Sequence, residues 1–148
     1  MKKLLPPILF VMFIVTMCVL GWAFGMNHTI PSPYNFIGAL FIVAGLELAA
    51  TGKRIFQQRK TNIMTFDKPD VLITEGIFQY SRNPMYLGFG IALAGVAILI
   101  GGSVSSLLLT ALFLLITDRW YIAFEEKMMR EKFGAEYDAY CQKVRRWI

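Results

Sequence analysis

Two short clusters of polar and aromatic side chains are the part of this sequence that could do chemistry. Residues 80–88 combine tyrosine, serine, arginine and asparagine, and residues 119–126 run from an arginine to a pair of glutamates. Each cluster also has a purely structural interpretation. The first can be a helix start capped by Asn83 beside a snorkelling arginine, and the second a solvated helical turn in which Glu126 pairs with Arg130. A functional site requires that the fold bring the two clusters together.

Several common catalytic chemistries lack their residues in this sequence. The one histidine, His28, stands apart from the other polar residues, and no cysteine and histidine cluster has the spacing of metal ligands. No Ser-His-Asp or Cys-His set can be assembled, and no phosphate-binding glycine loop follows a strand. We therefore expect a function that uses no metal ion, no nucleophilic serine and no imidazole.

The composition indicates what kind of fold must position the clusters. Of the 148 residues, 56% are hydrophobic and 17% are charged, and the mean hydropathy is +0.52. A soluble domain usually has about 25% charged residues, and one of this length could not bury so much apolar surface. The composition therefore argues against a soluble globular protein. It predicts an all-α, polytopic membrane protein with a single integral membrane domain over residues 1–148.

Four apolar segments have lengths that suit membrane-spanning helices. They lie at about residues 4–24, 34–50, 84–100 and 103–122. The last two are separated by Gly101 and Gly102, so they predict a tight helical hairpin that brings the two polar clusters to the same interface. Gly88 lies in the third segment, where small residues permit close helix packing.

The remaining segments are a long connection at residues 51–83 and a tail at residues 123–148. The connection contains many apolar residues and is too long for an idle loop, so we expect it to be functional. The tail suits a helix that continues the fourth span and is interrupted at Gly134. A second short helix then places Tyr137, Tyr140 and Val144 on one face.

All 15 lysines and arginines lie before the first span, in the connection, or at and beyond the end of the fourth span. The positive-inside rule therefore predicts a multi-pass protein whose two termini and long connection are cytoplasmic. Glu47 is an acid within the second apolar span. It either pairs with the nearby Lys53 and Arg54 or makes a polar contact near the functional site.

Four sequence blocks follow one another in the second half of the chain. They are LITEGIF at 72–78, RNPMYLG at 82–88, the glutamate pair at 125–126 and FGAEYDAY at 133–140. In this order they resemble the signature of the membrane-embedded isoprenylcysteine carboxyl methyltransferases and the related phospholipid N-methyltransferases. The resemblance covers about residues 70–146, whereas the first two spans match only as generic membrane helices.

The resemblance implies methyl transfer from S-adenosyl-L-methionine to a lipid-like or prenylated acceptor, most simply carboxylate O-methylation, in a pocket that the connection and the helical tail form at the membrane–cytosol interface. Glu125 would face the cofactor ammonium, Tyr86 or Phe78 its sulfonium, and Arg82 or Asn83 its carboxylate. The cofactor-binding residues that we carry over from the family are Leu72, Ile73, Phe78, Asn83, Pro84, Met85, Tyr86, Gly88, Glu125 and Glu126.

The resemblance also implies an arginine that holds the acceptor carboxylate just before the glutamate pair. We expect Arg82 and Arg119 to take this catalytic role, although Tyr121 occupies the position that matches the family arginine. Two residues correspond to about 200° around a helix, so Arg119 needs a change of register. Asn83 replaces a family histidine and removes a titratable group. Both departures concern the acceptor more than the cofactor.

Two other functions remain open from the sequence. Four spans and the intramembrane Glu47 are compatible with a small proton-coupled multidrug-type transporter. The Tyr-x-x-Tyr motif of the tail is compatible with a membrane reductase that uses a nicotinamide cofactor. The long basic connection and the extended tail favour the methyltransferase over the transporter.

Overall fold

The computed structural model describes residues 5–24, 29–59 and 70–148, and every regular element in these ranges is a helix. The all-α prediction is therefore confirmed for the described part of the chain. His28 and residues 60–69 of the predicted connection lie outside the described residues, and so do the two lysines that precede the first span.

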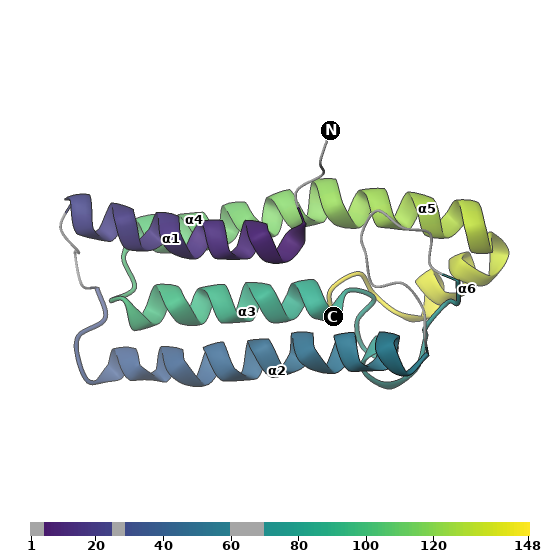
Figure 1. The fold of residues 1–148 in the computed structure, drawn as a ribbon, viewed down its shortest axis with the longest axis horizontal. Coiled ribbons are helices and arrows are strands. Elements are labelled where there is room, and N and C mark those ends of the chain that lie inside the picture. Colours follow the sequence, from purple (N-terminus) through teal and green to yellow (C-terminus); the bar gives the residue numbers. More distant parts are fainter. Residues whose placement is uncertain (1–4, 25–28, 60–69) are drawn as a thin grey trace.

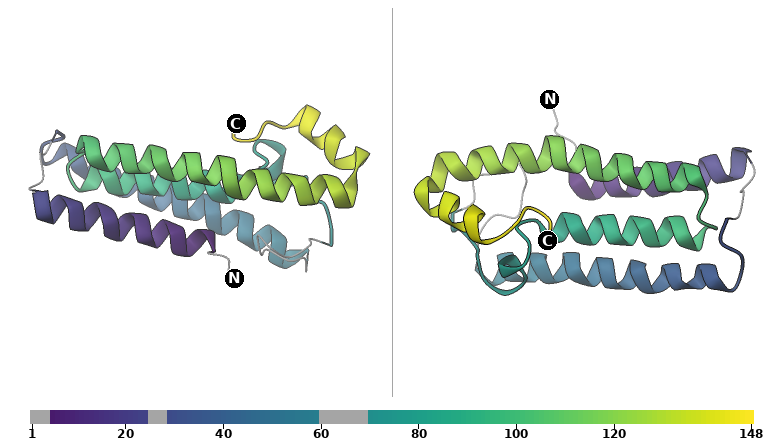
Figure 2. Two further views of the ribbon diagram at one scale, coloured as in Figure 1. Left: turned by 90° about the horizontal axis from the view of Figure 1, so that it is seen from above. Right: turned by 180° about the vertical axis from the view of Figure 1, so that it is seen from behind.

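The helices form an antiparallel bundle with a helical extension at one end (Figure 1). Their bounds are α1 Pro6–Phe24, η1 Tyr34–Phe36, α2 Ile37–Gln58, η2 Gly76–Gln79, α3 Pro84–Leu99, α4 Val104–Ile116, the π-helical η3 Thr117–Ile122, α5 Ala123–Phe133 and α6 Ala135–Lys143. Helix α5 continues the direction of α4, α6 folds back against α5, and the segment after α6 ends beside the start of α3 (Figures 1 and 2). The extension therefore lies at the end of the bundle where α2 ends and α3 begins.

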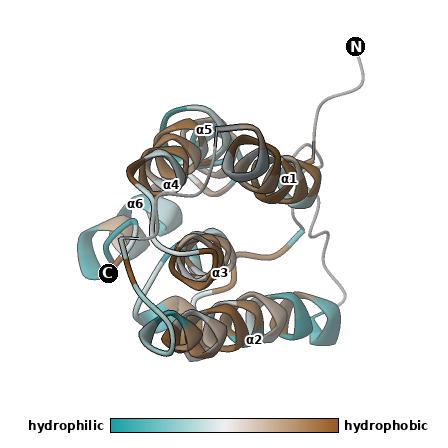
Figure 3. Cartoon of the chain, turned by 90° about the vertical axis from the view of Figure 1, so that its left-hand side faces the viewer, coloured by the Kyte–Doolittle hydropathy of each residue, from teal (hydrophilic) through white to brown (hydrophobic). Residues whose placement is uncertain are grey.

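Three helical stretches of the described part are long and apolar enough to cross a membrane. They are Pro6–Ala23, Tyr34–Gln58 and Val104–Phe133. Helix α3 is equally apolar but has only 16 residues. Viewed along the bundle, α3 lies between α2 on one side and α1 and α4 on the other (Figure 3). Its side chains at Ala92, Leu93 and Ala97 are accordingly fully buried.

Glycines bring α2 and α3 into close contact along their length. Gly45 of α2 faces Gly88 of α3, and Gly38 faces Gly95 one heptad further along. A Cβ atom added to Gly45 would collide with the carbonyl oxygen of Gly88. The prediction that small residues in the third apolar segment permit close helix packing is therefore confirmed.

Two glycine-containing turns give the second half of the chain its shape. Gly101 and Gly102 have φ angles of 109° and 66°, and their amides bond back to the last turn of α3. Gly134, with a φ of 50°, separates α5 from α6. Both are left-handed conformations that glycine adopts at little cost. The predicted hairpin and the predicted interruption of the tail are confirmed. The predicted second helix is present as α6 and carries Tyr137 and Tyr140, whereas Val144 lies just beyond its end; the three side chains are buried together.

Candidate active site

The hairpin of α3 and α4 brings the two polar clusters together at one end of the bundle. The hydroxyl of Tyr86, near the start of α3, donates a hydrogen bond to Oε1 of Glu125 in α5 over 2.6 Å. Arg82, just before α3, donates through Nη2 to Oε1 of Glu126 over 2.7 Å. Tyr86 and Glu126 are each only 5% exposed. The predicted meeting of the two clusters is therefore confirmed.

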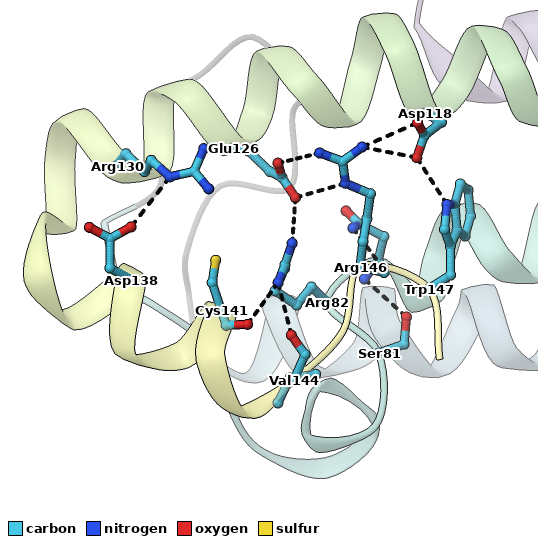
Figure 4. Close-up of polar contacts among 11 residues, drawn as sticks. Ser81, Arg82, Asp118, Glu126, Arg130, Asp138, Cys141, Val144, Arg146 and Trp147 are labelled. Carbon is cyan, nitrogen blue, oxygen red and sulfur yellow. Dashed lines mark hydrogen bonds and ion pairs between the residues drawn. The ribbon is translucent and has the colours of Figure 1, made fainter.

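Glu126 is the centre of a buried ion-pair network (Figure 4). Its second arginine partner is Arg146, which donates to Oε2 over 2.6 Å and to Oε1 over 3.0 Å. Arg130, the partner that helical spacing suggested for Glu126, instead pairs with Asp138 at 3.3 Å. Both carboxylate oxygens of Glu126 are thus engaged by guanidinium groups, which suits a charge buried this deeply.

The network holds the C-terminal segment against the bundle. Arg82 also donates through Nη1 to the carbonyl oxygens of Val144 and Cys141, over 2.8 and 3.2 Å. Arg146 reaches Asp118 of the π-helical segment at 3.1 Å, and this carboxylate also accepts a 3.0 Å hydrogen bond from Nε1 of Trp147. Hydrogen bonding to Glu126 and Asp118 raises the pKa of Arg146 above its ordinary value. The guanidinium of Arg146 therefore stays charged, and the tail is tied to three separate elements.

Further hydrogen bonds align the tail with the segment before α3. The side-chain amide of Asn83 donates to the carbonyl oxygen of Arg146 over 3.0 Å, and the hydroxyl of Tyr140 donates to that of Phe78 over 2.6 Å. Asn83 holds the N-cap position of α3, as predicted, but makes no capping bond because its side chain is used by the tail. Burial raises the pKa of Tyr140 to about 12, so this donor keeps its proton at neutral pH.

A cavity of about 760 Å³ lies where these elements meet. The sequence-predicted site residues on its wall are Ile73, Phe78, Arg82, Asn83, Met85, Tyr86, Glu125 and Glu126. Tyr137 and Tyr140 of α6 also contribute to the wall. One part of the cavity is therefore polar and aromatic. It is formed by three segments that are far apart in the sequence.

The opposite part of the cavity wall was not anticipated from the sequence. One face of α2 supplies it, together with residues 5–7 at the start of α1; the α2 residues are Leu46, Ala49, Ala50, Lys53 and Phe56. These residues follow helical i, i+3, i+4 and i+7 spacing, which is the signal that could have indicated the face. The role of Arg146 left no comparable signal, because one arginine in a basic tail resembles any other.

Four predicted site residues do not line the cavity. Leu72 packs against the buried tyrosines of α6, Pro84 is the buried first residue of α3, and Gly88 contacts α2. The side chain of Arg119 is 80% exposed and pairs with Asp118 at 3.6 Å. A π-helix does change the helical register at this point, yet the structure does not bring Arg119 to the cavity.

Tyr121, two residues further along, is buried and lies beside Tyr86, with 6.4 Å between the ring centroids. The position that matches the family arginine therefore holds an aromatic side chain packed against the wall of the cavity. Among the described residues, no group of three or more His, Cys, Asp or Glu side chains is placed to hold a metal ion.

A family model described as phospholipid methyltransferase matches residues 34–136, from η1 into α6. This chain belongs to the phospholipid methyltransferase family. The match includes α2 and the chain from α3 to the start of α6, and therefore most of the residues that line the cavity; those at residues 5–7, Tyr137 and Tyr140 lie outside it. Long apolar helices and membership of this family indicate a membrane protein.

Proteins similar to this chain include several named as protein-S-isoprenylcysteine O-methyltransferases. A probable protein-S-isoprenylcysteine O-methyltransferase of Oryza sativa subsp. indica is 28% identical over 115 residues, which cover 74% of this chain and 58% of the rice protein. A protein-S-isoprenylcysteine O-methyltransferase of Schizosaccharomyces pombe is 38% identical over 79 residues, covering 53% of this chain and 33% of the yeast protein. The chain thus spans little more than half the length of the rice relative. No solved structure matches it significantly.

Proposed function

We propose that this chain is an S-adenosyl-L-methionine-dependent methyltransferase that acts on a lipid-like, prenylcysteine-like acceptor at the membrane–water boundary. The observation that carries the proposal is the hydrogen bond from Tyr86 to Glu125 on the wall of a cavity that apolar helices also line. An acid beside an aromatic ring suits a cationic cofactor, and apolar walls suit a lipid chain. Carboxylate O-methylation is the reaction that the rice and fission yeast relatives favour.

The residues of the cavity fit the proposed cofactor. Its volume of about 760 Å³ lies within the range of about 300–1,000 Å³ that small-molecule sites occupy. The carboxylate of Glu125 would hold the ammonium group, and the rings of Tyr86 and Phe78 would face the sulfonium. The side-chain NH₂ of Asn83 gives one hydrogen to the carbonyl oxygen of Arg146, and its second hydrogen would bond the cofactor carboxylate. Met85 and Ile73 would line the adenine.

We assign Glu126 and Arg82 to holding the wall of the site. Glu126 binds two arginines, and Arg82 binds Glu126 and two tail carbonyls, so their contacts fix where α3, α5 and the tail stand. In this assignment Arg82 is a positioning residue, and other groups bind the methyl acceptor. Arg119, which is outside the cavity wall, is not assigned a role in the reaction.

The proposed mechanism needs little acid–base chemistry. When bound, S-adenosyl-L-methionine supplies an electrophilic methyl group. An acceptor carboxylate is already ionised at pH 7, because such groups titrate near about 3.3–3.7. The contribution of the protein is therefore to orient the acceptor and to exclude water, which can supply a large part of a rate enhancement. This agrees with a site built from Tyr86, Glu125 and apolar side chains.

We also propose that α1 to α4 all cross the membrane and that both chain ends and the connection 51–83 are cytosolic. The short α3 can do so because its neighbours surround it, as the buried Ala92, Leu93 and Ala97 indicate. The basic residues of the described part support this orientation, since they lie at the end of the bundle that carries α5 and α6.

Binding of the cofactor product tests the proposal directly. S-adenosylhomocysteine should raise the melting temperature of the purified protein. Tyr86→Phe, which removes only the hydroxyl, and Glu125→Gln, which removes the charge, should each reduce this shift. Asp138→Asn, a surface acid away from the cavity, serves as the control and should keep it.

Methyl transfer and cofactor competition complete the test. Radiolabelled methyl groups should appear in one member of a panel of total lipids and prenylated peptides. No stabilisation by millimolar S-adenosylhomocysteine would refute the proposal. Stabilisation by a nicotinamide dinucleotide instead would favour the membrane reductase.

A further inference from the structure

Two basic side chains line the cavity within the described part of the chain, Lys53 of α2 and Arg82. The guanidinium of Arg82 is used by Glu126 and by the carbonyl oxygens of Val144 and Cys141. Lys53 has no ion pair or side-chain hydrogen bond with any described residue, and it is exposed. Of the two cations on the cavity wall, Lys53 is therefore the one whose charge is not paired with another described residue.

The position of Lys53 matches the boundary between an apolar chain and a charged group. It shares one face of α2 with Leu46, Ala49 and Ala50, which make the cavity wall apolar on the bundle side of Lys53. An amphiphilic acceptor whose hydrocarbon chain lies against these residues would bring its polar group to Lys53. A lysine suits this place because its flexible stem packs on apolar surface while its ammonium stays at the water boundary.

We propose that Lys53 binds the anionic oxygen group of the methyl acceptor and thereby selects acceptors that carry one. The group is the free carboxylate of a prenylcysteine or the phosphodiester of a phospholipid, since both present anionic oxygens next to an apolar chain. The ammonium acts as a point charge that positions the acceptor against the cavity. This inference rests on the proposed methyltransferase function and adds a substrate-binding residue to it.

The adjacent Arg54 provides a matched control. It lies on the same helix, its guanidinium is 3.8 Å from Glu47, and it does not line the cavity. Lys53→Met keeps the length and apolar stem of the side chain but removes its charge, and Arg54→Met removes a charge outside the cavity. Lys53→Arg retains a cation at the site and should retain most of the affinity for the acceptor.

The experiment measures KM and kcat for two acceptors in detergent micelles, N-acetyl-S-farnesylcysteine and phosphatidylethanolamine. For the acceptor that the wild-type protein methylates, Lys53→Met should raise KM about tenfold or more, as expected for a lost charge-assisted hydrogen bond. The kcat, the KM for S-adenosyl-L-methionine and the stabilisation by S-adenosylhomocysteine should change little. Arg54→Met should behave as wild type. The arm in which activity is found identifies the anion as carboxylate or phosphate.

The possible failures are distinguishable. If the wild-type protein methylates neither acceptor and does not bind S-adenosylhomocysteine, the proposed function is overturned, and the role of Lys53 with it. If the wild-type protein is active but Lys53→Met keeps its KM, or Arg54→Met changes KM equally, only the role of Lys53 is overturned. Loss of S-adenosylhomocysteine stabilisation in Lys53→Met would also overturn it, because the lysine would then serve the cofactor or the fold.

Discussion

Replacing Glu126 by glutamine should loosen the C-terminal tail from the bundle. The side chain of Glu126 is 6% exposed and accepts hydrogen bonds from Arg82 and from Arg146, at distances of 2.6–3.0 Å. Glutamine has nearly the same shape but no charge, and it presents an NH₂ group where a guanidinium donor now finds an oxygen. The variant therefore tests the buried charge with little change in side-chain volume.

The size of the effect follows from the exposure of the three partners. Removing one partner of a buried ion pair costs about 3–5 kcal/mol, because the remaining charge stays buried without compensation. Arg82 is 11% exposed, but Arg146 is 34% exposed and can recover part of its hydration. We therefore expect a loss of about 2–4 kcal/mol in the free energy of unfolding. At about 2–4 °C per kcal/mol, the melting temperature should fall by roughly 5 °C or more.

The matched control is Asp138→Asn, which makes the same acid-to-amide change in an exposed pair. Asp138 lies 3.3 Å from Arg130, and both side chains are more than half exposed. Such pairs contribute about 0–1 kcal/mol, so its melting temperature should stay close to that of the wild type. Both variants are measured in the same detergent by thermal unfolding. Equal melting temperatures for the two would refute the claim that the Glu126 network holds the tail.

Two further predictions concern other parts of the fold. Gly45→Ala should lower the free energy of unfolding by about 1–3 kcal/mol, because the new methyl group would collide with the backbone of Gly88. The control is Ala44→Leu on the exposed face of α2, which should have little effect on the melting temperature. Burial raises the pKa of Tyr140 from 10.0 to about 12, so the unfolded chain releases this proton at lower pH than the folded protein does. The free energy of unfolding should therefore fall by roughly 2 kcal/mol as the pH rises from about 10 to about 12. Tyr140→Phe should remove that part of the loss, which denaturant unfolding measured at several pH values would detect; an unchanged pH profile would contradict the assignment.

The sequence predicted the helical elements well because strong local signals define them. The long apolar runs, the glycine pair at 101–102 and the positive-φ Gly134 each act over a few residues, and each is found where expected. Helix α2 differs in that it continues to Gln58, beyond the predicted span end at residue 50. Charged residues end an apolar run without ending a helix, because lysine and arginine are good helix formers.

The candidate site was predicted only in part because its wall depends on long-range packing. Tyr86 and Glu125 meet because the hairpin is forced by two glycines, and local reasoning is sufficient for that. The side-chain direction of Arg119 depends on the π-helical segment, and sequence spacing assumes an α-helix. The α2 wall depends on which face of a mostly apolar helix meets α3, and that choice is set by the glycines on both helices.

The glycine contact and the tail network together explain how a short apolar bundle can offer a polar cavity. Close contact between α2 and α3 fixes the position of the first turn of α3 relative to the face of α2 that carries Lys53. Tyr86 lies in this turn, and Arg82 lies just before it. A bundle alone would leave Arg82 exposed at this end, without partners for its guanidinium. The tail supplies two of those partners, the carbonyl oxygens of Cys141 and Val144. Arg146 of the tail also donates a hydrogen bond to Glu126, the third partner of Arg82. The contacts that engage the two terminal nitrogens of Arg82 therefore also close the polar wall of the cavity. Loss of the network should impair cofactor binding even though Glu126 need not touch the cofactor.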